Sequence, residues 1–245
     1  MDLYSFAPIA AALDGAYFIV TALADALVPL AGTASSAVAV ILITILVRAL
    51  LIPVGRSQVR AEITRRRLAP QLQALQRRYQ KSPEILRRKT MELYTEQNAS
   101  PLAGCLPTLL QAPVLSTVYG LFILATVNGH ANTLLSAQLF GIDLGASFLH
   151  QLGESAPGVG VIVFPGLLLV IAGVAWLSRR AALRMAPPAV EGAPALPGNL
   201  TGVLSWLPFV TVIFAALVPL AAVLYLTVST TWTLVERSIL RKRMN

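Results

Sequence analysis

The sequence predicts an all-α integral membrane protein with five transmembrane helices, an N-terminal interfacial amphipathic helix and a cytoplasmic helical hairpin. Of its 245 residues, 56% are hydrophobic and 12% are charged, and the mean hydropathy is +0.71, values that fit no ordinary soluble class. Apolar runs of about 20 residues, long enough to cross roughly 30 Å of hydrocarbon, recur along the chain. Lys and Arg gather in three segments, and this asymmetry assigns the loops to the two sides of a membrane.

The charge distribution predicts the orientation of the chain. Eighteen of the nineteen Lys and Arg residues lie in the segments 56–89, 179–184 and 237–243. In the segments 1–36 and 128–160, by contrast, all the charged residues are Asp or Glu. Because cytoplasmic loops retain Lys and Arg, the basic segments are predicted inside and the acidic ones outside. The N-terminus lacks the basic start of a secretory signal and the Arg-rich composition of an organelle presequence. We therefore expect a multi-pass protein of the bacterial plasma membrane, with its N-terminus outside and its C-terminus in the cytoplasm.

The first 35 residues are expected to form an amphipathic helix on the outer face. Residues 8–29 are apolar enough to span, but Asp14, Thr21 and Asp25 lie near one line on a helix. A narrow polar stripe suits a helix in the membrane interface with that stripe facing water. The alternative is a sixth span, which would place the N-terminus inside, where no basic residue is available to retain it.

The first span, residues 36–55, leads into a basic helical hairpin, residues 56–102, outside the membrane. The residues Lys81, Ser82 and Pro83 separate its two helices. Five of its arginines are candidates for docking to anionic lipid head groups, to the ribosome or to a translocation partner. They are Arg65, Arg66, Arg67, Arg77 and Arg78. In the alternative interpretation the hairpin is a solvated, salt-bridged surface whose charges only fix the topology.

The remaining elements alternate between spans and loops. In order, we expect a second span at 103–127, an extracytoplasmic segment at 128–158, a third span at 159–178 and a proline-rich cytoplasmic loop at 179–199. The uncharged run from Val203 to Val235 is too long for one span and rather short for two. Both flanking basic segments are predicted inside, so the run must cross and return, and Pro219 is the natural turn. This gives short fourth and fifth spans at 200–218 and 219–236, followed by a basic tail at 237–245.

The sequence offers no pattern for covalent chemistry. A single cysteine, Cys105, excludes an internal disulfide. There is no phosphate-binding glycine loop and no cluster of metal ligands, and His130 and His150 stand alone in the outer segment. We therefore predict no catalytic residue, no metal and no cofactor, and a protein that is not an enzyme. The formal charge of +8 lies on the predicted inner side and does not indicate a specific nucleic-acid partner.

Arg48 is the one basic residue inside a predicted span. It lies eight residues before Arg56, hence about 12 Å along a helix from the inner end of the span. A guanidinium in hydrocarbon costs about 2.5 to 3.5 kcal/mol on insertion scales unless water or a partner reaches it. We expect no acidic partner from the predicted spans. One interpretation is a side chain that extends toward the inner surface. The other is a water-filled cavity open to the cytoplasm, lined by Arg48 with Thr44 one helical turn away.

Several motifs resemble the YidC branch of the insertase family shared by bacteria, mitochondria and chloroplasts. They are the stretch Thr44 to Pro53, the basic hairpin, Ser100-Pro101-Leu102-Ala103-Gly104-Cys105-Leu106-Pro107, and Gln111-Ala112-Pro113. The resemblance implies a membrane protein insertase and chaperone that assists newly made proteins to integrate and fold. It further implies a five-helix core around a hydrophilic groove, closed toward the outside and open to the cytoplasm and to lipid. The implied groove residues are Arg48, Thr44, Gln111, Tyr225 and Ser229.

The resemblance also implies partners. These are nascent membrane proteins, together with the ribosome and the general secretion translocon. Two other function classes stay open on the residues alone. One is a small anion transporter or channel in which Arg48 binds the solute, although such proteins usually show an internal repeat. The other is a non-catalytic assembly scaffold whose basic hairpin recruits other proteins.

Overall fold

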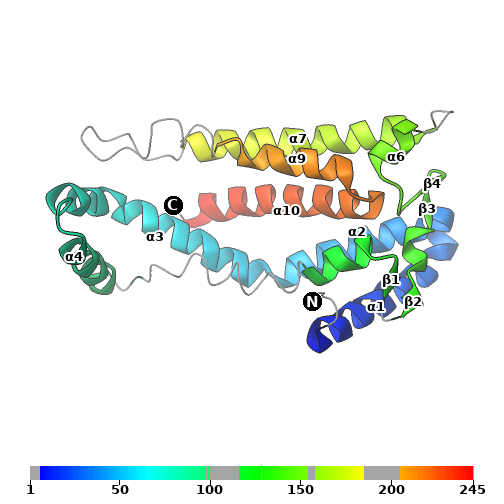
Figure 1. Cartoon of the computed structure of the whole chain (residues 1–245), viewed down its shortest axis with the longest axis horizontal. Helices are drawn as coiled ribbons and strands as arrows, with labels where there is room; N and C mark the ends of the chain where they lie inside the picture. The colour runs from blue at the N-terminus through cyan, green and yellow to red at the C-terminus, as the bar shows by residue number, and fades with distance from the viewer. Residues whose placement is uncertain are drawn as a thin grey trace.

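The computed structural model describes residues 6–97, 99, 116–127, 129–153, 158–184 and 205–244, and within them the chain is mostly helical. The helices are α1 (Ala7–Ala31), α2 (Ser35–Leu50), α3 (Ile52–Arg78), α4 (Pro83–Glu96), a helix at 116–123, α6 (Phe148–Gly153), α7 (Gly160–Arg184), α9 (Leu207–Leu217) and α10 (Leu220–Met244). In Figure 1, α10 runs between the pair α7 and α9 on one side and the line formed by α2 and α3 on the other.

Two helical runs in the described part of the chain have the length and hydropathy of membrane spans, Ala7–Leu50 and Gly160–Arg184. The helix α9 is apolar but shorter, about 17 Å long at 1.5 Å per residue. The predicted second span at 103–127 is described only in part, because residues 103–115 lie outside the described residues. The basic tail predicted at 237–245 continues α10 as a helix to Met244.

α1 packs lengthwise against α2 through one stripe of its surface (Figure 1). Leu13, Val20 and Ala24 are buried on that side, whereas Asp14 and Asp25 are exposed. This separation follows from the helical period, since positions three, four and seven apart share a face. A polar stripe that points away from the protein is compatible with an interfacial helix and with a sixth span, and the interfacial placement stays a prediction.

The long line of α2 and α3 is interrupted at Leu51. Pro53 has no N–H to donate to the carbonyl of Ala49, so the regular helical ladder cannot continue through this point. The Leu51 N–H still donates to the Val47 carbonyl at 3.0 Å, and the Gly55 N–H donates to the Leu51 carbonyl at 3.1 Å. The predicted span at 36–55 therefore consists of α2 and the first turn of α3, joined at a bend.

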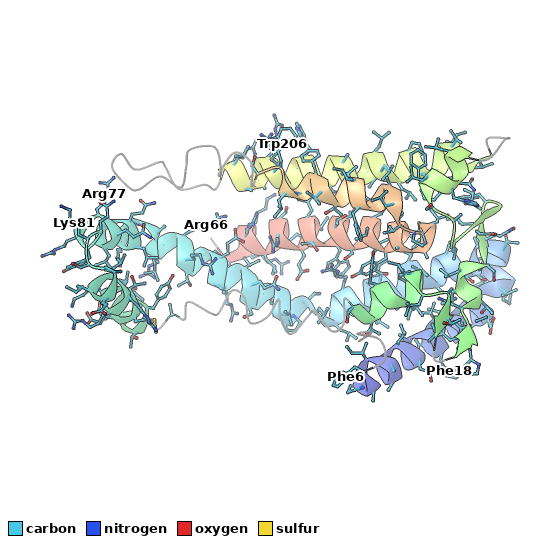
Figure 2. All side chains as sticks on the ribbon, in the orientation of Figure 1. Phe6, Phe18, Arg66, Arg77, Lys81 and Trp206 are labelled. Carbon is cyan, nitrogen blue, oxygen red and sulfur yellow. The ribbon has the colours of Figure 1, made fainter. Side chains whose placement is uncertain are left out.

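α3 and α4 form the basic hairpin, at the end of the molecule opposite the strands (Figure 1). α3 ends at Arg78 and α4 begins at Pro83, at the break that Lys81, Ser82 and Pro83 indicate. Arg77 and Lys81 stand at the tip of the hairpin (Figure 2).

The segment that follows the helix at 116–123 contains two small β-hairpins that the sequence analysis did not predict. β1 (Thr126–Val127) pairs with β2 (His130–Ala131), and β3 (Gln138–Leu139) pairs with β4 (Ile142–Asp143), both antiparallel. Between β3 and β4, Phe140 and Gly141 have φ of 55° and 78°. Two positive φ angles in a two-residue loop are the type I′ geometry that matches the twist of paired strands.

The chain turns between α9 and α10 at Val218 and Pro219, which agrees with the predicted turn at Pro219. This turn is tied to the segment between β4 and α6, because the N–H groups of Leu220 and Ala221 donate to the carbonyls of Ala146 and Leu144, both at 2.9 Å. The residues from Leu220 to Val223 are fully buried in the core that includes Phe164 of α7. The bundle is therefore closely packed at the end that carries the strands.

Candidate functional site

Arg48 connects α2 to α10. It lies on the last turn of α2, is half-buried, and its Nη2 donates a hydrogen bond to Oγ of Ser229 on α10. Ser229 is only 3% exposed, so this acceptor is held inside the protein. Among the described residues, no other protein group hydrogen-bonds to this guanidinium. Because a guanidinium has five N–H donors, most of its donors face the surrounding cavities.

Thr44 and Tyr225 lie one helical turn from Arg48 and Ser229, on the same faces of α2 and α10. Thr44 is 4% exposed, and its hydroxyl donates to the Val40 carbonyl at 2.7 Å. That bond satisfies the hydroxyl without an outside partner. The Tyr225 ring packs against Phe122, with ring centroids 6.2 Å apart. Four predicted groove residues are thus brought together, and the fifth, Gln111, lies outside the described residues.

A cavity of about 420 Å³, here called the basic cavity, extends from Arg48 toward the C-terminal end of α10. Four arginines and one carboxylate contribute to its wall. They are Arg48, Arg66, Arg237, Arg241 and Glu62. The opposite wall is made by α7 and α9. An excess of positive charge in a recess walled by protein focuses the field and attracts anionic groups.

A second cavity of about 430 Å³, here called the apolar cavity, lies on the other side of Arg48. Its wall comes from α1, α2, the helix at 116–123 and Tyr225 of α10. Apart from Arg48, its polar lining consists of Thr44, Thr117 and the phenol of Tyr225. Arg48 therefore lies in the wall that the basic cavity and the apolar cavity share. This arrangement can attract an acidic group beside a surface that accommodates an apolar segment.

The expectation that no acidic residue approaches Arg48 is wrong. Glu236 of α10 lines a third, small cavity of about 30 Å³ together with Arg48 and Arg237. The sequence contained a signal for this placement, because Glu236 follows Ser229 by seven residues, two helical turns on the same face. The sequence analysis missed it because it considered only the uncharged run that ends at Val235, although Glu236 is the last residue of the predicted span 219–236.

The hairpin arginines predicted to dock partners are not all equivalent. Arg65, Arg67, Arg77 and Arg78 are exposed, whereas Arg66 is half-buried and pairs with Glu62. Figure 2 shows Arg66 between α3 and the end of α10. Glu62 also accepts two hydrogen bonds from Nη2 of Arg241, at 2.9 and 3.0 Å. Arg66 therefore belongs to the joint between α3 and α10, and the other four form the outer surface of the hairpin.

No set of three His, Cys, Asp or Glu side chains that could hold a metal ion occurs in the described part of the chain. The geometry that is present is one arginine hydrogen-bonded to a buried serine, with buried Thr44 and Tyr225 nearby and the two larger cavities both lined by that arginine.

Comparison with known proteins decides the family. The profile of the family described as 60Kd inner membrane protein matches residues 28–245, most of the chain. The chain belongs to the 60Kd inner membrane protein family. The YidC-type resemblance that the motifs predict is confirmed, and the helical fold with its apolar helices is that of an α-helical membrane protein.

Relatives of the chain occur in bacteria and chloroplasts. It is 36% identical to a membrane protein insertase YidC of Clostridium perfringens over 85 residues, which are 35% of this chain and 36% of that protein. It is 30% identical to the YidC of Zymomonas mobilis over 187 residues, 75% of this chain and 30% of that protein. The chloroplast inner membrane protein ALBINO3 of Arabidopsis thaliana is 28% identical over 224 residues, 83% of this chain and 46% of that protein. The chain spans about a third of the length of the first two relatives.

Proposed function

We propose that this protein is a membrane protein insertase and chaperone, which helps newly made proteins integrate and fold in the bacterial plasma membrane. The observation that carries the proposal is Arg48, held by buried Ser229 at a wall shared by the basic cavity and the apolar cavity. In this proposal five spans, α2, the segment 103–127, α7, α9 and α10, surround a groove that is open to the cytoplasm and to lipid. The groove residues are Arg48, Thr44, Gln111, Tyr225 and Ser229.

The physical task of an insertase is to move a polar segment across hydrocarbon. Each charged or unsatisfied polar group costs several kcal/mol there. A wet recess that reaches part of the way shortens the dry path. Arg48 attracts acidic or polar residues of the incoming tail, while the apolar helix of the client leaves toward lipid along the apolar cavity. We use "client" for the newly made membrane protein. The drive is hydrophobic partitioning, with no nucleotide consumed.

The packing of the bundle supports one direction of opening. The end that carries the strands is closed by fully buried residues from Leu220 to Val223, and the basic cavity lies toward the opposite end. We place the closed end outside and the basic hairpin in the cytoplasm, with the N-terminus outside and the C-terminus inside. The short α9 thins the bilayer beside the groove and lowers the barrier further.

The exposed hairpin arginines are proposed to dock partners. Arg65, Arg67, Arg77 and Arg78 present positive charge away from the bundle, which suits anionic lipid head groups, the ribosome or the general secretion translocon. The two other function classes, an anion transporter and a passive scaffold, gain no support from the described residues or from the relatives.

The proposal is tested by replacing Arg48 in a strain depleted of its own insertase. Arg48→Ala and Arg48→Glu should each lower insertion of a single-span client with an acidic N-terminal tail by roughly tenfold or more, the scale of one lost charged hydrogen bond. Arg48→Lys should retain part of the activity, because it keeps the charge and loses the planar fork of donors. Insertion is measured as the fraction of client whose N-terminal tail is exposed to protease outside.

Arg184→Ala is the matched control, since Arg184 is an exposed arginine at the end of α7 that lines none of the cavities around Arg48. It should insert the client as the wild type does. Full insertion by both Arg48→Ala and Arg48→Glu would refute the groove mechanism and leave the scaffold alternative standing.

A further inference from the structure

The small cavity brings one carboxylate to the guanidinium of Arg48. Glu236 and Arg48 both line this cavity, together with Gln58 of α3 and Arg237 of α10. Arg48 approaches from α2 and Glu236 from α10, so the pair spans the junction of the two helices. Among the described acidic residues, Glu236 and Glu62 line cavities that also contain Arg48, and Glu62 is already taken by Arg66 and Arg241.

Two residues hold the Glu236 carboxylate in place. The indole Nε1 of Trp232, one turn earlier on α10, donates to Oε2 of Glu236 at 3.0 Å. On the other side, Oε1 lies against Gly55 at the start of α3, where an added Cβ would come 2.0 Å from this oxygen. A side chain at position 55 would therefore occupy the space that the Glu236 carboxylate fills. The bend at Pro53 brings Gly55 to this position.

The Oε1 atom is buried and accepts no hydrogen bond from the described protein groups. A buried anionic oxygen without a partner is costly unless water or a nearby cation compensates it. The small cavity, about 30 Å³, has room for about one or two water molecules. Across such a gap, the attraction between opposite charges is stronger than in bulk water because the surrounding dielectric is low.

Arg237 is the other cation beside Glu236, and it lines both the small cavity and the basic cavity. Its side chain is exposed, however, so water and salt screen its interaction with the carboxylate. Arg48 is half-buried and fixed by Ser229, and it is therefore the cation on which Glu236 acts more strongly.

We propose that Glu236 is a positioning residue for the groove, an internal counter-charge that partly neutralises Arg48 when no client is bound and competes with acidic client segments. This inference rests on the proposed insertase function and adds a determinant of client selection to it. Glu236 lowers the preference of the groove for acidic tails and lets neutral tails enter on nearly equal terms. It also compensates Arg48 between clients, when an unpaired guanidinium would be costly inside the membrane.

The test compares two clients that differ only in tail charge. Purified protein in vesicles of defined lipid receives a single-span client whose N-terminal tail carries two Asp residues, or the same client with both replaced by Asn. Glu236→Gln removes the charge and keeps the shape and the acceptor for Trp232. We expect it to lower the half-saturating concentration of the acidic client by roughly three- to tenfold, the size of coupling between neighbouring charges, with little change for the neutral client.

Weaker changes in the same direction are expected from two variants that disturb the carboxylate without removing it. Gly55→Ala displaces Oε1, and Trp232→Phe removes the indole N–H donor and keeps an aromatic ring. Glu84→Gln is the charge-matched control, since Glu84 is exposed at the start of α4 and should alter neither client. Together these variants keep the test valid if one of them folds poorly.

The outcomes separate this inference from the proposed function. If Glu236→Gln affects acidic and neutral clients equally, or neither, the counter-charge role is wrong while Arg48 can still be required for insertion. If Arg48→Gln leaves insertion unchanged, the proposed function itself fails. In the double variant Arg48→Gln, Glu236→Gln, the preference between the two clients should disappear, and its persistence would show that another group selects tail charge.

Discussion

Replacing Glu62 by Gln should loosen the joint between α3 and α10. The carboxylate accepts hydrogen bonds from Arg241 at 2.9 and 3.0 Å and also pairs with Arg66. The side chains of Arg241 and Glu62 are 16% and 30% exposed, so solvent screens the pair only in part. A hydrogen bond to a charged group contributes about 1.5 to 3 kcal/mol, and discounting for this exposure leaves about 1 to 2 kcal/mol. In a chain of this size that corresponds to a fall of roughly 2 to 8 °C in Tm.

The assay is a double-mutant cycle by thermal unfolding in detergent, with Glu62→Gln, Arg241→Gln and both together. The pair should show a coupling of about 1 kcal/mol, so the double variant should be less destabilised than the sum of the singles. Glu92→Gln is the control, because Glu92 and its partners Arg88 and Lys89 are 43%, 69% and 40% exposed, more than Glu62 and Arg241, and such surface pairs contribute about 0 to 1 kcal/mol. Strict additivity, or an effect of Glu62→Gln no larger than that of the control, would refute the claim that the Glu62–Arg241 pair stabilises the packing of α3 against α10.

Other predictions test packing and topology. Ala222→Leu should destabilise the protein by about 1 to 3 kcal/mol, measured by the same unfolding assay, because residue 222 has no exposed surface and no room for a larger side chain. Gly145→Ala should lower Tm, since its Cβ would come 2.9 Å from a carbonyl of the η3 turn (Thr133–Leu135), whereas Gly153→Ala, with open space around it, should not. In a cysteine-free background, Phe140→Cys should react with an impermeant thiol reagent added outside intact cells and Lys81→Cys should not, and the reverse pattern would contradict the proposed orientation.

The elements that the sequence predicted best are those marked by proline. Pro83 begins α4 and Pro219 lies in the turn before α10, because a proline interrupts the helical ladder wherever it occurs. The four-residue spacings of the groove residues, Thr44 to Arg48 and Tyr225 to Ser229, likewise follow from the helical period. Arg48 could be singled out from the sequence alone because it was the one cation in an otherwise apolar run.

Other features depend on contacts between elements that no local pattern contains. Glu236 and Arg48 come from different helices, α10 and α2, and line one cavity beside Gly55 of α3, a placement that the sequence analysis did not predict. The β1–β2 hairpin is different, since Asn128-Gly129 between its strands is a strong turn signal that was available in the sequence and was not used. It was missed because the segment was treated only as a loop between spans.

The most direct test of the account asks whether a client passes beside Arg48. A photo-reactive phenylalanine at Tyr225 replaces one aromatic ring with another inside the site, and the same residue at Trp176, on an exposed face of α7, serves as the control position. With a ribosome-stalled single-span client, Tyr225 should crosslink at least fivefold more than Trp176, and Arg48→Glu should abolish the difference. Equal crosslinking at the two positions, or crosslinking at Tyr225 that Arg48→Glu leaves unchanged, would contradict the central claim that Arg48 guides clients through the groove.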